Sequence, residues 1–103
     1  MARQWIVRPL AQADIEAAGT WYEQQQTGLG LRFIDVADQV LRRIRETPLQ
    51  LPLIATEIRR ALLHTFPYAL YFRLTEERIV VLAVLHLRRD PRTWRERTQP
   101  SRR

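Results

Sequence analysis

The stretch FPYALYFRLTEERIVVLAVLHLRRDPRTWRER, residues 66–97, predicts the centre of the fold. Tyr68–Leu74 is rich in aromatic and apolar residues, which suit a half-buried strand. Residues 75–77 (TEE) form a charged cluster that is long enough for a hairpin loop. Ile79–Leu87 then runs almost without a polar residue, which is typical of a central strand covered on both faces. We therefore predict a β-hairpin with a buried second strand, followed by a short basic helix around Pro91–Arg97.

The residues before this hairpin predict one strand and two helices. Arg3–Arg8 is a first short strand that Pro9 ends, because proline lacks a backbone donor. Apolar residues recur at helical spacing over Leu10–Gln26 and again over Leu31–Glu46. The intervening TGLG stops the first helix. A connection this short predicts two antiparallel helices packed as a hairpin.

The segment between the second helix and the β-hairpin is the hardest to assign. Leu49–Thr56 contains Pro52 and is predicted to be an irregular connection, while Glu57–Leu63 is a candidate strand with a helical turn as the alternative. The order is β-α-α-β-β-β with a short C-terminal helix, which predicts an α+β fold. A small antiparallel sheet would pack on the helical hairpin, with its other face partly open.

Length and composition set the limits of the prediction. A chain of 103 residues predicts one domain over residues 1–103, of which 98–103 is expected to be a flexible basic tail. The sequence has neither 18 consecutive apolar residues nor a signal-peptide pattern, so a cytoplasmic location is expected. There is no cysteine and only two histidines are present, so we expect no disulfide, metal or cofactor.

The charge balance predicts an anionic partner. The net charge is +6, and every one of the 17 basic residues is Arg. Such a chain favours nucleic acid or an acidic protein surface, and guanidinium groups suit bidentate contacts with phosphate or carboxylate. A GC-rich genome that replaces Lys by Arg explains the same composition equally well. The absence of Lys excludes a Lys general base or Schiff base.

His86 and the charges that follow it form the main candidate site. Alternation along the strand predicts that His86 shares a face with the apolar side chains of Val84, Leu82 and Val80. With Arg88 and Arg89 it could surround an anionic group, or it could end the strand with one satisfied hydrogen bond.

Arg59 and Arg60 are candidates for the same site. They would lie beside Arg88 and Arg89 if their strands pair, giving a surface for phosphate or carboxylate. The alternative is one solvated Arg and one that forms an ion pair with Glu57 or Asp90.

Support for catalysis is weak. The sequence has no Cys, no Lys, no Gly-x-Ser-x-Gly, no Gly-rich phosphate loop and no close pair of His. The only arrangement left is His86 as general acid or base, with Arg stabilising a phosphate, and it has no second proton-transfer partner. Tyr68, Tyr71 and Phe72 could stack on nucleobases, but core packing is the favoured interpretation.

An ordered set of motifs from Ile6 to Arg97 resembles the ParE branch of the RelE/ParE toxins of bacterial type II toxin–antitoxin systems. The set comprises Asp14-Ile15, Trp21-Tyr22, Gly28-Leu29-Gly30 with Phe33, Ile58-Arg59-Arg60, Phe66-Pro67-Tyr68 with Tyr71, residues 81–86 (VLAVLH), Arg88-Arg89-Asp90-Pro91 and Trp94. The resemblance implies a small sheet backed by a helical hairpin. It also implies a cognate ParD-like antitoxin whose C-terminal segment wraps the toxin.

The resemblance further implies a cellular target. ParE-type members poison DNA gyrase, whereas RelE-type members cut mRNA on the ribosome. For a ParE-type chain we expect target contacts from Arg59, Arg60, His86, Arg88, Arg89 and Trp94, and antitoxin contacts from Trp21, Tyr22, Tyr68 and Tyr71.

The mRNA-cutting members use a set of Lys, Arg, Glu, His or Tyr residues in the sheet cleft. Here His86, Arg59, Arg60 and Arg88 could fill part of that set. Lys is missing and no Tyr follows Tyr71, so the sequence favours a gyrase-binding toxin that is not an enzyme. A ribosome-dependent endoribonuclease is the alternative, and a chain that binds its antitoxin but has lost toxicity is a third possibility.

Overall fold

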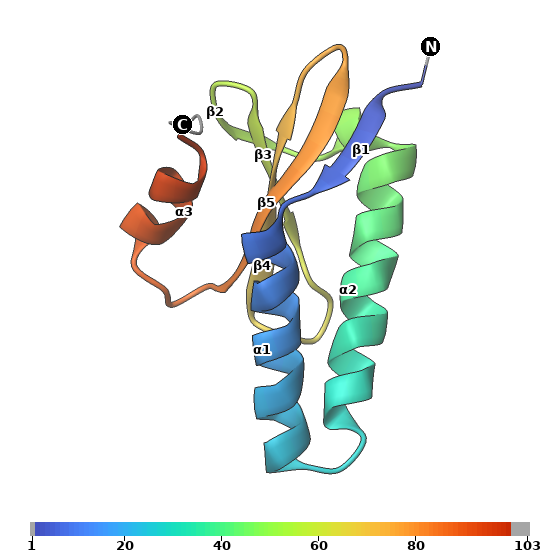
Figure 1. Ribbon diagram of the computed structural model, residues 1–103, viewed down its shortest axis with the longest axis vertical. Coiled ribbons are helices and arrows are strands. Elements are labelled where there is room, and N and C mark those ends of the chain that lie inside the picture. Colours follow the sequence, from blue (N-terminus) through green and yellow to red (C-terminus); the bar gives the residue numbers. More distant parts are fainter. Residues whose placement is uncertain (1, 100–103) are drawn as a thin grey trace.

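A five-stranded sheet carries a helical hairpin on one face and a short helix on the other (Figure 1). The computed structural model describes residues 2–99. The elements are β1 (Gln4–Val7), α1 (Pro9–Gln25), α2 (Leu29–Glu46), the 3-10 turn η1 (Pro48–Gln50), β2 (Leu53–Ala55), β3 (Ile58–Leu62), β4 (Tyr68–Leu74), β5 (Arg78–His86) and α3 (Pro91–Arg97). The predicted α+β class, the helical hairpin and the C-terminal helix are confirmed.

The sheet is mixed and has one strand more than the sequence predicts. Its order is β1-β5-β4-β3-β2. The pairs from β2 to β5 are antiparallel as predicted, but β1 runs parallel to β5, from Gln4 opposite Arg78 to Val7 opposite Val81. The extra strand, β2, lies in the segment predicted to be irregular. It is three residues long and follows Pro52 at the sheet edge, where a proline is tolerated.

The two long helices cross closely at the tip of their hairpin. A Cβ on Gly30 would come within 2.5 Å of the Gly19 carbonyl oxygen, so only glycine fits there. Gly28 precedes α2 with φ of 90°, a left-handed conformation that glycine adopts readily. The Glu23 carboxylate accepts hydrogen bonds from the backbone N–H groups of Gly28 and Gly30, and so satisfies donors that the helix start leaves unpaired.

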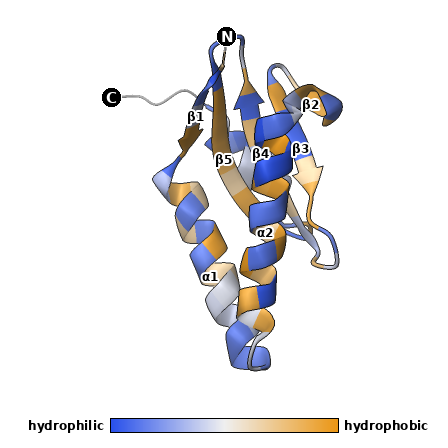
Figure 2. Cartoon of the chain, turned by 90° about the vertical axis from the view of Figure 1, so that its right-hand side faces the viewer, coloured by the Kyte–Doolittle hydropathy of each residue, from blue (hydrophilic) through white to orange (hydrophobic). Residues whose placement is uncertain are grey.

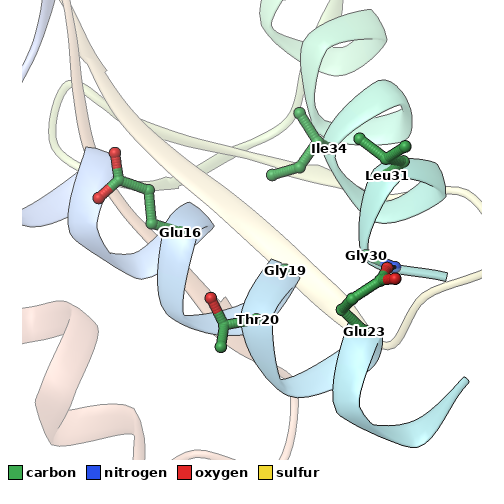
Figure 3. A pocket seen from close by; sticks show the side chains of 7 residues that line it. All are labelled: Glu16, Gly19, Thr20, Glu23, Gly30, Leu31 and Ile34. Atoms are coloured by element: carbon green, nitrogen blue, oxygen red, sulfur yellow. Dashed lines mark hydrogen bonds between the residues drawn. The ribbon is translucent and has the colours of Figure 1, made fainter. Parts of the chain in front are cut away.

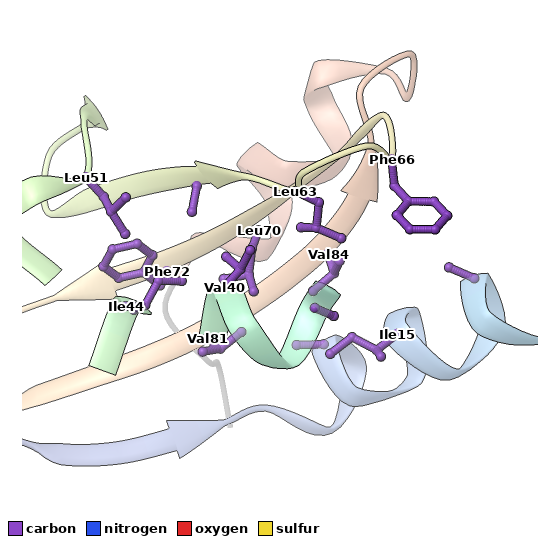
Figure 4. Close-up of a cluster of buried hydrophobic side chains, with 14 of the residues drawn as sticks. Ile15, Val40, Ile44, Leu51, Leu63, Phe66, Leu70, Phe72, Val81 and Val84 are labelled. Carbon is purple, nitrogen blue, oxygen red and sulfur yellow. The ribbon is translucent and has the colours of Figure 1, made fainter. Parts of the chain in front are cut away.

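The main core lies between the helical hairpin and the sheet. Figure 2 shows hydrophobic and hydrophilic residues in turn along both helices and mostly hydrophobic residues in β5. In Figure 4, Ile44 of α2 lies beside Phe72 of β4, and Ile15 of α1 lies on the side of Val84 of β5; all four side chains are buried. The period of these apolar positions therefore predicts the packed face of each helix correctly.

A β-bulge in β5 changes which side chains share a face. Tyr71 pairs with Ala83, but the next residue along, Phe72, pairs with Val81, so Leu82 is an extra residue. Leu82 and Ala83 both face away from the helices, whereas Val81 and Val84 belong to the helix-side core. The prediction that His86 alternates with Leu82 and Val80 is therefore wrong, because one inserted residue shifts a period of two.

The second face of the sheet is covered in part by α3. Trp94 stacks on Tyr71 with ring centroids 5.4 Å apart and planes 11° apart. The Arg73 guanidinium also donates to the carbonyl oxygen of Thr98. Thr98 and Gln99 are the described part of the predicted tail. Residues 100–103 of that tail lie outside the described residues.

Candidate functional site

A cleft of about 230 Å³ lies between α1 and the end of β5. It is lined by Asp14, Ala17, Ala18, Trp21, Tyr68, Val84, His86 and Arg89. The cleft exists because the pairing of β1 with β5 stops at Val81. The chain then turns at Arg8 and Pro9 into α1, which leaves the remainder of β5 without a neighbouring strand on that side. We call this space the β5-end cleft.

His86 makes one hydrogen bond that limits its chemistry. Its Nδ1 accepts from the backbone N–H of Arg88 at 3.0 Å, and its ring lies edge-on to the Tyr68 ring at 5.2 Å. In a neutral imidazole one nitrogen carries the proton and the other accepts. Because Nδ1 accepts here, Nε2 carries the proton and can donate. His86 in this arrangement is a hydrogen-bond donor to a ligand and not a ready general base.

Tyr68 supplies a neutral hydroxyl to the β5-end cleft. Burial raises the pKa of Tyr68 above its usual value, the nearby Tyr22 raises it further, and the Arg89 guanidinium opposes both by lowering it. The Tyr68 ring also packs on Phe33 of the core at 5.0 Å. One end of this side chain is therefore structural, while its hydroxyl is un-ionised at neutral pH.

Asp14, which lines the cleft, forms an ion pair with an arginine of α3. Arg97 of α3 donates two hydrogen bonds to the carboxylate of Asp14 in α1, at 2.9 and 3.0 Å, and their side chains are only 17% and 14% exposed. Arg97 also donates to the Leu82 carbonyl, and Asp14 accepts from the Val84 N–H. The pair thus satisfies two backbone groups that the bulge and the absent strand would leave unpaired.

Sequence reasoning assigned no role to this ion pair. Asp14 and Arg97 are 83 residues apart, and neither sits in a local pattern that predicts a partner. Asp14 entered the sequence analysis only through the family resemblance. Arg97 was merely the last residue of a predicted helix. No signal in a single sequence would have found the pair, because it depends on how α1 and α3 pack around β5.

Arg59 and Arg60 lie away from the β5-end cleft. Their strand, β3, pairs with β4 and not with β5, so the predicted position beside Arg88 and Arg89 is wrong. Arg59 donates to the Leu51 carbonyl at 2.6 Å and so holds the connection before β2. The suggested carboxylate partners bind other arginines, since Glu57 pairs with Arg73 and Asp90 with Arg92.

The predicted aromatic contacts divide into accessible and buried ones. Tyr22 packs between Phe33 and Phe66 in the core, and burial raises its pKa. Tyr71 is buried against Trp94 on the other face of the sheet. Trp21, by contrast, is 54% exposed at the mouth of the β5-end cleft. Among the predicted site residues, the cleft therefore brings together Trp21, Tyr68, His86 and Arg89.

A second cleft, of about 350 Å³, lies at the tip of the helical hairpin (Figure 3). It is lined by Glu16, Gly19, Thr20, Glu23, Gly30, Leu31 and Ile34. Its wall is mainly apolar, and Glu23 points towards Gly30, where its carboxylate is held by backbone N–H groups. Within residues 2–99 no group of three or more His, Asp or Glu side chains could hold a metal ion, and no helix is long and apolar enough to cross a membrane.

Comparisons with known proteins give one family and one similar fold. The family model described as the ParE toxin of the type II toxin–antitoxin system parDE matches residues 6–91. A solved structure of the chromosomal ParDE system from P. aeruginosa contains a similar chain, with a TM-score of 0.71 and 17% sequence identity. The match covers 82% of this chain and 95% of that one, which shows a shared fold. No curated protein matches the sequence.

Proposed function

The chain belongs to the ParE toxin family of type II toxin–antitoxin systems, and from that premise we propose that it inhibits DNA gyrase by binding it. An antitoxin neutralises it by covering the binding surface. The observation that carries the proposal is the composition of the β5-end cleft, which offers groups for binding but an incomplete set for proton transfer. Trp21 and Arg89 are exposed there, and the Nδ1 of His86 is already engaged.

The positions of the remaining arginines support binding over cleavage. Arg59 holds backbone carbonyls, and Arg60 pairs with Tyr71 in the sheet, at a distance from His86 along β4. A phosphate-cleaving site would need several such groups to converge on one scissile bond. Arg88 and Arg89 are instead both exposed, and Arg89 lines the cleft, where its guanidinium group can bind an acidic protein surface.

A supercoiling assay tests the proposal. Purified chain should inhibit gyrase, and co-addition of the protein encoded by the adjacent gene should restore activity. Arg89→Ala should weaken inhibition at least roughly tenfold, because it removes a charged contact at the cleft mouth. Arg42→Ala, at an exposed position of α2 outside the cleft, is the matched control and should inhibit like the unmodified chain. Unchanged supercoiling at saturating chain would overturn the proposal.

One observation favours a ribosome-dependent mRNA endonuclease as a second candidate. The sequence analysis found no second proton-transfer partner for His86, whereas the structure places the neutral Tyr68 ring 5.2 Å from it. In a translation reaction, cuts at codon-defined positions that disappear with His86→Ala would establish this function in place of gyrase inhibition. Normal growth on induction without the adjacent gene would instead indicate a chain that has lost toxicity.

A further inference from the structure

The outer edge of β3 is open near its end. Arg60 donates its backbone N–H to the Pro52 carbonyl at 3.1 Å, across the edge that faces away from β4. Because the backbone groups of a strand alternate between its two edges, Leu62 directs its N–H and C=O to the same edge. The pairing of β3 with β2 extends only over Ile58 and Arg59. Within residues 2–99, the backbone N–H and C=O of Leu62 therefore have no strand opposite them.

A cleft of about 330 Å³ lies beside this open edge. It is lined by residues of α2 and by residues at the end of β3, namely Gln39, Val40, Arg43, Leu62, Leu63 and His64. Val40 and Leu63 are buried, whereas the side chain of Leu62 is 54% exposed. The cleft therefore has an apolar wall that a ligand can reach from the edge of the sheet. We call it the β3-edge cleft.

The ionisable side chains of the β3-edge cleft are basic. Arg43 and His64 line it, and no acidic residue does. Both are exposed, and Arg43 forms no ion pair with a carboxylate within residues 2–99. A guanidinium group can bind one carboxylate through two parallel hydrogen bonds. The complementary ligand therefore has an acidic group next to an apolar one.

We propose that the β3-edge cleft binds a short, extended, acidic segment of the inhibited protein, an inference that rests on the proposed function. The segment adds to the sheet by pairing its backbone with the N–H and C=O of Leu62. Its residue opposite Leu63 then points to the helix side, towards Val40, because Leu63 belongs to the helix-side core. An acidic side chain next to this residue can reach Arg43. Pro52 occupies the edge further along, so the paired stretch is short.

The open backbone selects a peptide over a nucleic acid. Leu62 presents a donor and an acceptor in the plane of the sheet, which is the pattern that another strand matches. The wall behind them is apolar, and Arg43 is the only arginine that lines the β3-edge cleft. A surface that binds a nucleic acid backbone instead uses several cations to neutralise successive phosphates.

The β3-edge cleft and the β5-end cleft lie at the same end of the sheet. Tyr68 of β4 lies between them, since it pairs with His86 on one side and its carbonyl accepts from the Leu63 N–H on the other. Two strand spacings, roughly 10 Å, separate β3 from β5 there. One cleft is bordered by α1 and the other by α2. A protein that covers the β5-end cleft can therefore reach the β3-edge cleft as well.

Matched charge reversals in the full chain test the cleft. The probe is purified gyrase, and the measurement is the concentration of chain that halves its supercoiling activity. Arg43→Glu should raise this concentration at least roughly tenfold, because a repelling charge replaces the cation of the cleft. Arg42→Glu makes the same change at the adjacent exposed position of α2, outside the cleft, and should leave the value within about twofold.

A second pair of variants tests the strand edge. Leu62→Asp places a negative charge at the open edge and should also raise the half-inhibitory concentration at least roughly tenfold. Leu53 of β2 is equally exposed, at 54%, but lies outside the cleft, so Leu53→Asp is the control and should leave the value within about twofold. All four variants replace exposed side chains, and unchanged thermal melts confirm that each one is folded.

Hydrogen exchange of the gyrase complex gives an independent measurement, in which the Leu62 amide should gain protection. If the unmodified chain inhibits gyrase and Arg43→Glu and Leu62→Asp inhibit as well as their controls, the inference is overturned while the proposed function stands. If the unmodified chain leaves supercoiling unchanged, the proposed function fails, and the inference with it. Weaker binding of the protein encoded by the adjacent gene, with inhibition of gyrase intact, would assign the cleft to the antitoxin and overturn the inference. A dimer of the chain that Leu62→Asp abolishes, again with inhibition intact, would assign the edge to a second copy and overturn it too.

Discussion

In the first half of β5, residues 78–81, the edge that faces away from β4 is paired with β1, whereas in the second half, residues 82–86, the same edge meets side chains. Both halves are buried on their faces. Backbone pairing closes the first edge completely. Side-chain pairing by Asp14 and Arg97 satisfies the second edge but leaves the β5-end cleft beside it. The difference shows that a sheet edge can be protected from strand addition by side chains as well as by a neighbouring strand.

The largest loss of stability is expected from removing the Asp14 carboxylate, which helps to close the edge of the second half of β5. Asp14→Ala should lower the free energy of unfolding by about 3 kcal/mol, because it leaves Arg97 unpaired in a mostly buried position and the Val84 N–H without an acceptor. Urea denaturation measures it. A double-mutant cycle with Arg97→Ala should give a coupling of at least about 1 kcal/mol, and additive losses would show that the pair does not close the edge.

A smaller loss of stability, equal in the two halves of β5, is expected when core side chains are shortened. Val81 and Val84 lie on either side of the bulge, both face the helices, and both are almost fully buried. Val81→Ala and Val84→Ala should each lower the free energy of unfolding by about 2 kcal/mol through lost burial and a small cavity. Chemical denaturation of the two variants side by side measures this. A much smaller loss for Val84→Ala would mean that the second half is less tightly packed than the first.

The smallest effect is on the pH dependence of stability. It involves Tyr68, which pairs with His86 at the end of β5. The pKa of Tyr68 is raised in the folded chain, mainly by burial, so its un-ionised form contributes stability that is complete below the unfolded value near 10. That contribution is lost as the pH rises from there through the folded pKa. Urea midpoints should therefore fall as the pH rises above about 10. Tyr68→Phe should reduce the fall, leaving the part due to Tyr22, which shifts in the same direction.

Periodicity predicted most elements, because it reports which side of each element is buried. The β4–β5 hairpin, both long helices and α3 follow from residues near one another in sequence. The parallel pairing of β1 with β5 could not be predicted this way, since it joins distant segments without a hairpin signal. The three-residue β2 is too short to show alternation. The bulge at Leu82 has no marker, because Leu82 and Ala83 are as apolar as their neighbours.

The sequence predicted which residues at the end of β5 belong to the candidate site, but it did not predict how they are arranged. His86 and Arg89 were marked by the change in polarity after an apolar run. Arg59 was misplaced because the order of strands in the sheet cannot be read from alternation. Trp21 and Tyr68 were expected to contact the antitoxin, whereas His86 was expected to contact the target. Only the packing of α1 against β5 places all of them in one cleft.

The Asp14–Arg97 pair also bears on the order in which the chain folds. The pair joins residues that are 83 positions apart, so a long loop must close before it can form. The two long helices and the β4–β5 hairpin join residues that are close in sequence, and their contacts form at a lower cost in entropy. We therefore expect the edge beside the second half of β5 to close late in folding.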